Sequence, residues 1–179
     1  MSRTLSLRNR QRVRRVNTSL LRRVTLQLLS EQFHVADFGI AIHLVTADEM
    51  SRMNWTFLQH EGSTDVITFD HSSEPASLKQ PATGLHGEIF ICIDDAVKQA
   101  REFRTTWQAE LMRYVIHGLL HLRGHDDLKP SARRIMKVEE NRLLRETSHS
   151  FPLAELDRDW RKPILISSHK SKRSSRSTA

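Results

Sequence analysis

Apolar residues recur at helix and strand spacing along the first half of the chain, and their pattern predicts an order of elements. Apolar positions three and four apart predict an amphipathic helix over about residues 19–32. The alternating, β-branched run FGIAIHLVT (38–46) predicts a strand. A second helix is predicted over EMSRMNWTFLQ (49–59), with Asp48 as its N-cap. The run STDVITFD (63–70) predicts another strand.

The second half of the chain is predicted to be mostly helical. Residues 71–84 contain two prolines and three serines and predict a loop. The apolar run GEIFICID (87–94) that follows predicts a buried strand. Three further helices are predicted, over residues 94–104, 106–122 and 132–146. Asp94 or Asp95 is the expected N-cap of the first, and Pro130 and Ser131 mark the start of the last.

This order of elements favours an α+β fold. The strands do not alternate strictly with the helices, which argues against a doubly wound parallel sheet. The length of 179 residues is that of one domain. We therefore expect a single domain in which a small mixed sheet of about four strands packs with about five helices.

Positive charge is concentrated at the two ends of the chain. Residues 1–23 hold eight arginines and no acid, and residues 161–179 hold six basic residues and no acid. Subtracting these 14 from the 28 basic residues leaves 14 against 21 acidic ones, a balance of −7 between the ends. Arginine-rich segments suit a partner that carries phosphates, although a basic tail can also serve only solubility. We expect a domain over residues 1–160 and a disordered tail over residues 161–179.

The remaining composition points to a soluble protein of a reducing compartment. Apolar residues make up 38% of the chain, and no run approaches the ~20 residues that a membrane-spanning helix needs. The basic N-terminal segment lacks an apolar stretch and a small-residue cleavage site, so we expect no secretory signal. The single cysteine, Cys92, cannot form an internal disulfide, which favours the cytoplasm.

The strongest chemical signal is the segment HGLLHLRGHDD (117–127). His117 and His121 lie four residues apart on a predicted helix, so their side chains share one face and can converge on one ion. Gly124 follows where a left-handed residue reverses the chain after a helix. The turn returns the next residues toward the same ion, and the spacing therefore predicts a metal site.

The residues after this turn are the candidates for a third ligand, namely His125, Asp126 and Asp127. Three protein ligands with an open position for water are typical of catalytic rather than structural zinc sites. In zinc peptidases the helix reads H-E-x-x-H and the glutamate is the general base. Gly118 stands at that position here, so peptide hydrolysis is disfavoured.

The same segment resembles the signature HGxLHLxGxDH of the YbeY-type endoribonucleases, a family of rRNA maturation factors. Two further blocks are similar to that family in order and spacing, MNWTFLQHEGSTDVITFD (53–70) and LHGEIFICIDDAVKQA (85–100). The pair Glu110-Leu111 resembles the Glu-Leu upstream of the first histidine. The resemblance spans about residues 35–146. It implies a zincin-like domain with the metal-binding helix in its core.

The resemblance also implies a ligand set. The third histidine of the family falls at Asp127, so the implied ligands are His117, His121 and Asp127, and the implied cofactor is one Zn²⁺ per chain. An aspartate oxygen binds zinc at a distance similar to that of an imidazole nitrogen, so coordination survives the exchange. His125 falls at a position that the family does not use for metal, and we prefer Asp127 to it.

Further positions match family motifs and are candidates for supporting roles. Asn54 and Asp65 are catalytic candidates, although Thr64 and Asp65 are also suited to turn the chain before a strand. Glu88 lies in a predicted strand and is a candidate to support a metal ligand.

One family position lacks its usual cation. Leu58 stands where the family has an arginine that lines the catalytic groove, and leucine cannot contact a phosphate. Arg123, inside the metal motif, is a candidate replacement.

The resemblance implies a single-strand-specific, metal-dependent endoribonuclease. It would act in rRNA processing, notably maturation of the 3′ end of the small-subunit (16S) rRNA, and in ribosome quality control. The implied partners are the rRNA precursor and the small ribosomal subunit, with a ribosomal protein or a GTPase as further candidates. Two alternatives stay open: a non-catalytic ribosome-binding factor that keeps the fold, and a metal hydrolase of another substrate.

Overall fold

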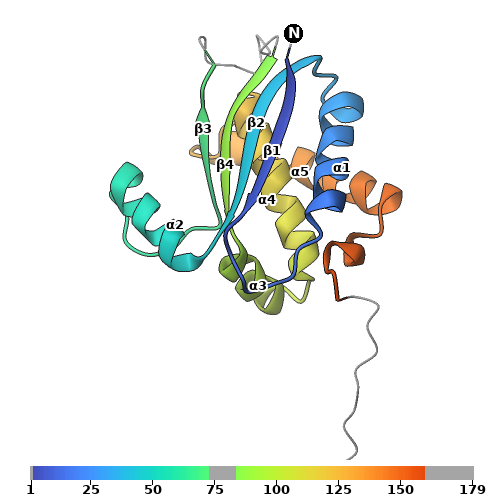
Figure 1. Ribbon diagram of the computed structural model, residues 1–179. Helices are drawn as coiled ribbons and strands as arrows, with labels where there is room; N and C mark the ends of the chain where they lie inside the picture. The colour runs from blue at the N-terminus through green and yellow to red at the C-terminus, as the bar shows by residue number, and fades with distance from the viewer. Residues whose placement is uncertain (1, 73–83, 160–179) are drawn as a thin grey trace, which may run out of the picture.

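A mixed sheet of four strands forms the centre of the described part of the protein, residues 2–72 and 84–159 of a computed structural model (Figure 1). The strands are β1 (Arg3–Asn9), β2 (Asp37–Val45), β3 (Val66–Asp70) and β4 (Gly84–Cys92). Their order is β1-β2-β4-β3, with β1, β2 and β4 parallel and β3 antiparallel to β4.

Five α-helices accompany the sheet in the described ranges, which confirms the predicted α+β class. They are α1 (Thr18–Gln27), α2 (Ala47–Met53), α3 (Ile93–Glu102), α4 (Trp107–Leu122) and α5 (Pro130–Ser150). Helices α1 and α2 continue into the π-helical turns η1 (Leu28–Gln32) and η2 (Asn54–Leu58), and the 3₁₀ turn η3 (Leu153–Leu156) follows α5. In Figure 1, α1, α4 and α5 lie together beside the sheet, while α2 projects past β3. Within the described ranges, no helix has the length and apolar character to cross a membrane.

Helix α4 packs tightly against the sheet and is the central element of the core. Its apolar residues join those of β2 and β4 in one buried cluster, where each fully buried leucine or isoleucine contributes roughly 1.5–3 kcal/mol. Gly118 permits this approach, because a Cβ added there would lie 2.6 Å from Cγ2 of Ile89 on β4. The close contact fixes the height and rotation of α4, and with them the positions of His117 and His121.

The N-cap of α2 differs from the prediction. Thr46 caps the helix through its hydroxyl, which accepts a hydrogen bond from the backbone N–H of Glu49 at 3.3 Å. Asp48, the predicted cap, lies in the first turn instead. Both residue types favour caps and first turns, so composition alone did not separate them.

The boundary between β4 and α3 also differs from the prediction. The strand ends at Cys92, so the predicted strand over residues 87–94 is too long at its C-terminal end. Neither Asp94 nor Asp95 is the N-cap, and both lie in the first helical turn. The carboxylate of Asp94 accepts a hydrogen bond from the backbone N–H of Ala47 at 2.9 Å, which ties the start of α2 to α3.

The arginine-rich N-terminal segment is partly built into the fold, which the sequence did not indicate. Strand β1 lies in this segment, and its alternation is too short and too polar to predict a strand. Arg10 forms an ion pair with Glu49 at 2.8 Å, and Arg15 forms one with Asp159 at 3.0 Å. The predicted tail over residues 161–179 and most of the predicted loop lie outside the described residues.

Candidate metal centre

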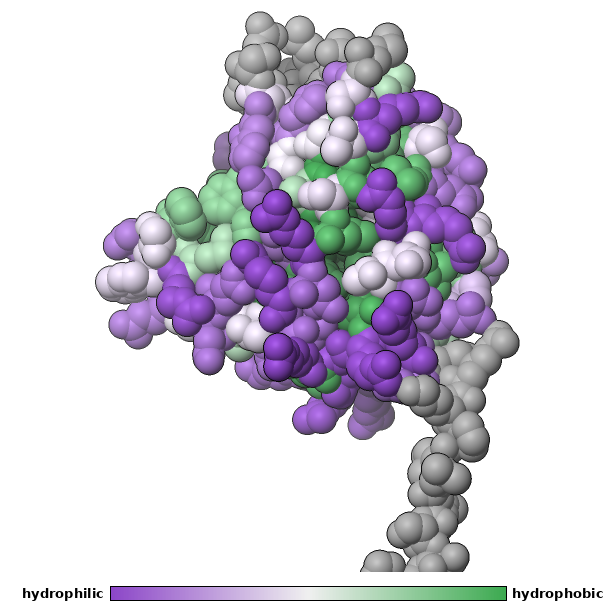
Figure 2. Space-filling model, viewed as in Figure 1, coloured by the Kyte–Doolittle hydropathy of each residue, from purple (hydrophilic) through white to green (hydrophobic). Residues whose placement is uncertain are grey.

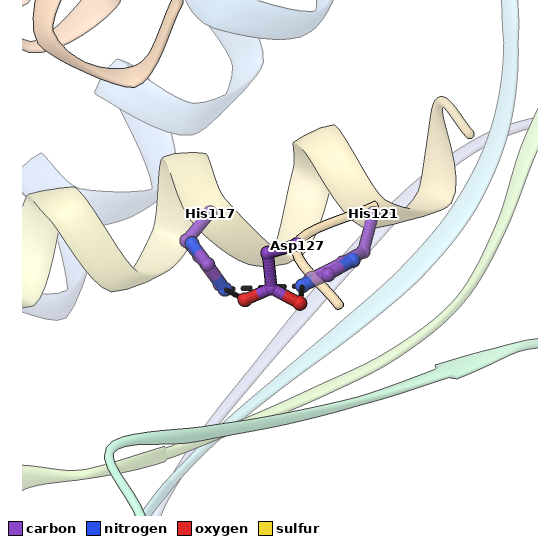
Figure 3. A group of neighbouring side chains, drawn as sticks. All are labelled: His117, His121 and Asp127. Atoms are coloured by element: carbon purple, nitrogen blue, oxygen red, sulfur yellow. Dashed lines mark hydrogen bonds and ion pairs between the residues drawn. The ribbon is translucent and has the colours of Figure 1, made fainter. Parts of the chain in front are cut away.

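The structure brings His117, His121 and Asp127 together beside α4 (Figure 3). One ligand atom from each lies within 4.8 Å of the others. The two histidine Nε2 atoms are 3.0 Å apart, and they lie 3.7 Å and 4.0 Å from the carboxylate oxygens of Asp127. Two donors on one zinc ion lie at most about 4.4 Å apart, since each bond is about 2.0–2.2 Å long. All three separations satisfy that limit.

Gly124 brings Asp127 back to the histidines. Its φ of 87° lies in the left-handed region, where the sequence predicted such a residue. The backbone N–H groups of Gly124 and His125 donate to the carbonyls of His121 and Leu120 at 2.8 Å and 3.0 Å, so the helix end is closed by hydrogen bonds. The reversal places a carboxylate opposite the helix face that carries the histidines.

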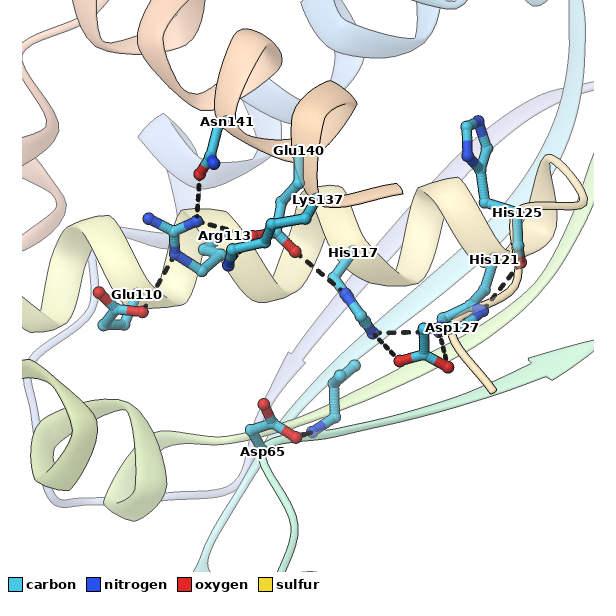
Figure 4. A network of polar contacts seen from close by, with 11 residues as sticks. Asp65, Glu110, Arg113, His117, His121, His125, Asp127, Lys137, Glu140 and Asn141 are labelled. Carbon is cyan, nitrogen blue, oxygen red and sulfur yellow. Dashed lines mark hydrogen bonds and ion pairs between the residues drawn. The ribbon is translucent and has the colours of Figure 1, made fainter. Parts of the chain in front are cut away.

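His117 is oriented by a buried carboxylate. Its Nδ1 lies 3.1 Å from Oε2 of Glu140 on α5 (Figure 4). Burial alone would raise the pKa of Glu140, but hydrogen bonds from His117, Lys137 and Arg113 outweigh it and lower the pKa to about 2. Glu140 is therefore ionised and can only accept, so Nδ1 of His117 carries the proton. A carboxylate behind a histidine in this way is a usual support of metal-binding histidines.

His121 is oriented by the backbone. Its Nδ1 lies 3.1 Å from the carbonyl oxygen of His125, which can only accept a hydrogen bond, so this nitrogen also carries the proton. Burial, together with the neighbouring His117, lowers the pKa of His121, which favours the neutral ring. A neutral ring protonated on Nδ1 presents a lone pair on Nε2.

The donor set fits a metal ion. Both Nε2 lone pairs are directed into the same small space, and the Asp127 carboxylate faces them. Lone pairs and a negative charge at these distances repel one another unless a cation or a proton lies between them. Two imidazoles and one carboxylate form a borderline-soft set that suits Zn²⁺.

The two rival third ligands do not join this group. The His125 side chain is directed away from the cluster (Figure 4), and only its backbone carbonyl supports His121. Asp126 accepts a hydrogen bond from the backbone N–H of Leu128 at 3.0 Å, which stabilises the turn. Of the three candidates, Asp127 is the one that the structure brings to both histidines.

The catalytic candidates Asn54 and Asp65 lie in different surroundings. Asp65 lines a cavity together with His117 and Asp127, and its Oδ1 also accepts hydrogen bonds from Thr64 and from the N–H of Val66, as expected of a turn before a strand. Asn54 is 5% exposed, and its amide donates to the carbonyl of Gly62 at 2.9 Å, which holds the loop after η2.

The remaining candidates do not contact the group of His117, His121 and Asp127. Glu88 pairs with Nε2 of His43 on the neighbouring strand at 3.0 Å. Leu58 is 48% exposed on η2. Figure 2 shows apolar surface on this side of the molecule, between α2 and β3. Arg123 donates to the carbonyl of Phe33 at 2.5 Å and lies over its ring, so it does not replace the arginine expected at position 58.

Sequence reasoning missed the wall that α5 contributes. Glu140, Arg113 and Lys137 form a linked group behind His117, with Arg113 and Lys137 at 2.6 Å and 2.7 Å from Glu140 Oε1. Glu140 follows His117 by 23 residues and reaches it only because α5 packs on α4. The apolar stripe of α5 was the one available signal, since it predicts packing against the core without specifying the partner.

Fold and site together define an α+β protein with a candidate metal centre of the three-ligand type found in zinc hydrolases. The family model of endoribonuclease YbeY matches residues 6–148. The chain therefore belongs to the endoribonuclease YbeY family, which confirms the resemblance predicted from the motifs.

Individual relatives agree with this membership. The chain is 36% identical over 106 residues to an endoribonuclease YbeY of Salinibacter ruber. The aligned residues make up 59% of this chain and 68% of that protein. This chain is 37% identical over 119 residues to an endoribonuclease YbeY of Parabacteroides distasonis, covering 66% and 78% of the two chains. A solution structure from Thermotoga maritima, 24% identical with a TM-score of 0.60, covers 86% of this chain and 95% of that one and shares the fold.

Proposed function

We propose that this protein is a metal-dependent endoribonuclease that cleaves single-stranded RNA during rRNA maturation. Family membership over residues 6–148 supports an RNA-cleaving hydrolase that acts in rRNA processing. The observation that carries the metal-dependent part is the convergence of His117, His121 and Asp127 within 4.8 Å. Both histidines are held with Nε2 directed at one point, which is the preorganisation that a catalytic metal site requires.

The chain's own residues have distinct roles in this proposal. His117, His121 and Asp127 hold the metal, which we propose to be one Zn²⁺ per chain. When bound, the metal supplies Lewis acidity and positive charge for hydrolysis of a phosphodiester. Asp65 lines the cavity beside these ligands and is our candidate to accept a proton there. We assign Asn54 a structural role, because its amide is engaged with the loop backbone.

The first test measures metal content. Mass spectrometry of the purified chain and of Asp127→Ala should give about one zinc per chain in the parent and a marked loss in the variant. Absence of metal in both proteins after zinc supplementation would contradict the proposed centre. The protein would then be better explained as a non-catalytic ribosome-binding relative that keeps the fold.

The second test measures cleavage. The zinc-loaded chain should cut a single-stranded RNA, whereas His117→Ala and His121→Ala should lose activity while keeping a folded circular dichroism spectrum. A duplex of the same sequence serves as the substrate control for strand specificity. A well-folded, metal-loaded parent that cuts no single-stranded RNA would reject the nuclease and favour a hydrolase of another substrate.

Finer parts of the proposal concern the cellular role. We propose the 3′ end of the small-subunit rRNA as the substrate, the cytoplasm as the location, and ribosomal proteins or a GTPase as partners, with a further role in ribosome quality control. We also keep the domain limit at residue 160 and the basic tail over residues 161–179 as proposals. Nuclease-protection mapping of rRNA 3′ ends in cells that lack the protein would test the substrate, since unprocessed 3′ ends should accumulate.

A further inference from the structure

A cavity of about 340 Å³ opens beside the metal centre, between α4 and α5. His117 and Asp127 line one side of it, and Asp65 lines another. Helix α5 contributes a further wall with Arg133, Met136, Lys137 and Glu140. The cavity is therefore shared between the proposed metal ligands and a cationic helix face that has no assigned role.

The charges around this cavity balance. Three described lining residues are cationic (Arg113, Arg133 and Lys137) and three are anionic (Asp65, Asp127 and Glu140), which gives a net charge of zero. A bound divalent metal then leaves an excess of two positive charges, which suits a phosphodiester. Without the two α5 cations the same site would be neutral with metal bound, and without all three cations it would repel a phosphate.

The cations differ in how far the fold already uses them. Arg113 is 20% exposed and bonds to Glu140 and Asn141, so it mainly holds α5 against α4. Lys137 is 55% exposed, and its one ammonium group also contacts Glu140. Arg133 is exposed, and its Nε donates to the backbone carbonyl of Asp127 at 2.9 Å. That bond uses one of the five N–H donors of a guanidinium group.

The Arg133 contact also fixes the distance to the metal ligands. By bonding the carbonyl of Asp127, the guanidinium is held next to the residue whose carboxylate faces His117 and His121. A phosphate at the metal centre would thus lie near a preorganised fork that matches two of its oxygens.

A buried hydroxyl adds a further donor. Tyr114 lines the cavity, is 2% exposed, and its hydroxyl has no hydrogen-bond partner in the described ranges. Burial raises the pKa of Tyr114, so the hydroxyl stays protonated. A buried donor without a partner is unfavourable unless a ligand or a water accepts from it.

From the cavity, its charge balance and the placement of Arg133, we propose that Arg133 and Lys137 form a phosphate-binding wall for the RNA strand at the metal centre. The inference rests on the proposed function for its choice of ligand. The wall binds the phosphate groups next to the cleaved bond, and the bases lie outside the cavity. These contacts determine which phosphodiester of the RNA lies at His117, His121 and Asp127. Leu58 leaves η2 without a cation, so α5 supplies this charge.

A salt series with an uncleavable RNA tests the wall. The probe is a fluorescein-labelled, 2′-O-methylated single strand, and its anisotropy is measured with the zinc-loaded full chain at several sodium chloride concentrations. Arg133→Gln and Lys137→Gln should each weaken binding roughly fivefold to tenfold, as for the net loss of one solvent-accessible hydrogen bond. Each should also reduce the slope of log affinity against log salt by about 0.7–1.

The matched control is Arg134→Gln, the same change one residue along α5. Arg134 is also exposed, but it is rotated by about 100° around the helix and is not among the cavity-lining residues. It should bind RNA within twofold of the parent. Arg133→Lys should recover only part of the affinity, because it keeps the charge but loses the fork that matches two phosphate oxygens.

Three results would overturn the inference. Equal losses in Arg133→Gln and Arg134→Gln would show a diffuse basic surface, and no loss in Arg133→Gln would show that the wall does not touch RNA. A fall in zinc content of Arg133→Gln would show that Arg133 acts only by bracing Asp127. The probe is not cut, so binding and cleavage are measured separately. If binding depended on Arg133 but the chain cleaved no RNA, the proposed function alone would be rejected. If the chain cleaved RNA but its RNA affinity did not depend on Arg133, the phosphate-binding wall alone would be rejected.

Discussion

Replacing Glu140 by glutamine should weaken the proposed zinc binding, although Glu140 is not one of the three proposed ligands. Its two oxygens accept from three donors: Nδ1 of His117 at 3.1 Å, and Arg113 and Lys137 at 2.6 Å and 2.7 Å. Glutamine keeps one accepting oxygen and adds an NH₂ group that can only donate. Either His117 or the two cations therefore meet a donor instead of an acceptor.

The size of the effect follows from what His117 loses. Without its acceptor the ring can rotate or carry its proton on Nε2, and either change removes a metal ligand. Loss of such a supporting partner typically costs 10–100-fold in metal affinity. Because Glu140 is 4% exposed and ionised, we expect the upper end, about 100-fold or about 2.7 kcal/mol.

Competition with a chromophoric zinc chelator measures this affinity directly. Glu139→Gln is the matched control, since Glu139 neighbours Glu140 but bonds Arg142 at 2.6 Å. Circular dichroism and thermal unfolding of the metal-free proteins would establish that both variants fold. If Glu140→Gln kept the parent's zinc affinity within twofold, the orientation of His117 by Glu140 would be refuted.

Three further predictions follow from the packing and the site. Gly118→Ala should lower stability by about 1–3 kcal/mol, because its Cβ would meet Ile89 at 2.6 Å; an unchanged urea midpoint would refute the close contact. Burial lowers the pKa of His43 below its usual 6.5, although Glu88 acts in the opposite direction. As the pH falls, the unfolded chain therefore binds a proton at this histidine before the folded chain does, so stability should fall as pH drops below 6.5. His43→Gln should flatten that fall between pH 7.5 and 5.5 in urea titrations of the metal-free chain, and an equally steep fall would contradict the assignment. Asp127→His, which introduces the histidine implied by the motif resemblance, should retain about one zinc by mass spectrometry; loss of zinc would show that this turn accommodates only a carboxylate.

The parts of the site that sequence could predict are those encoded locally. His117 and His121 share a helix face because four residues make about one turn, and Gly124 marks the reversal that returns Asp127. Glu140 could not be predicted, because its contact depends on how two helices pack and no local spacing records it.

The same distinction holds for the fold. The apolar periodicity of α4 predicted a core helix, and the alternation of β2 predicted a strand, because both elements carry strong repeats. Strand β1 was missed because Leu5 and Leu7 are its only apolar residues, and its identity comes from parallel pairing with β2. The caps of α2 and α3 were misplaced by two or three residues, since acids favour the first turn as well as the cap.

The glycine between the two histidines also limits which reactions this scaffold could acquire. A single substitution that introduced the glutamate of a peptidase at position 118 would drive its Cβ into Ile89 and so direct the new carboxylate at the sheet rather than at the cavity. At least one compensating change on β4 would have to come first, and it would leave a void in the core while α4 still carried glycine. Evolution of this sequence toward peptide hydrolysis would thus have to pass through a destabilised intermediate. Changes on the exposed face of α5 do not carry this cost in stability.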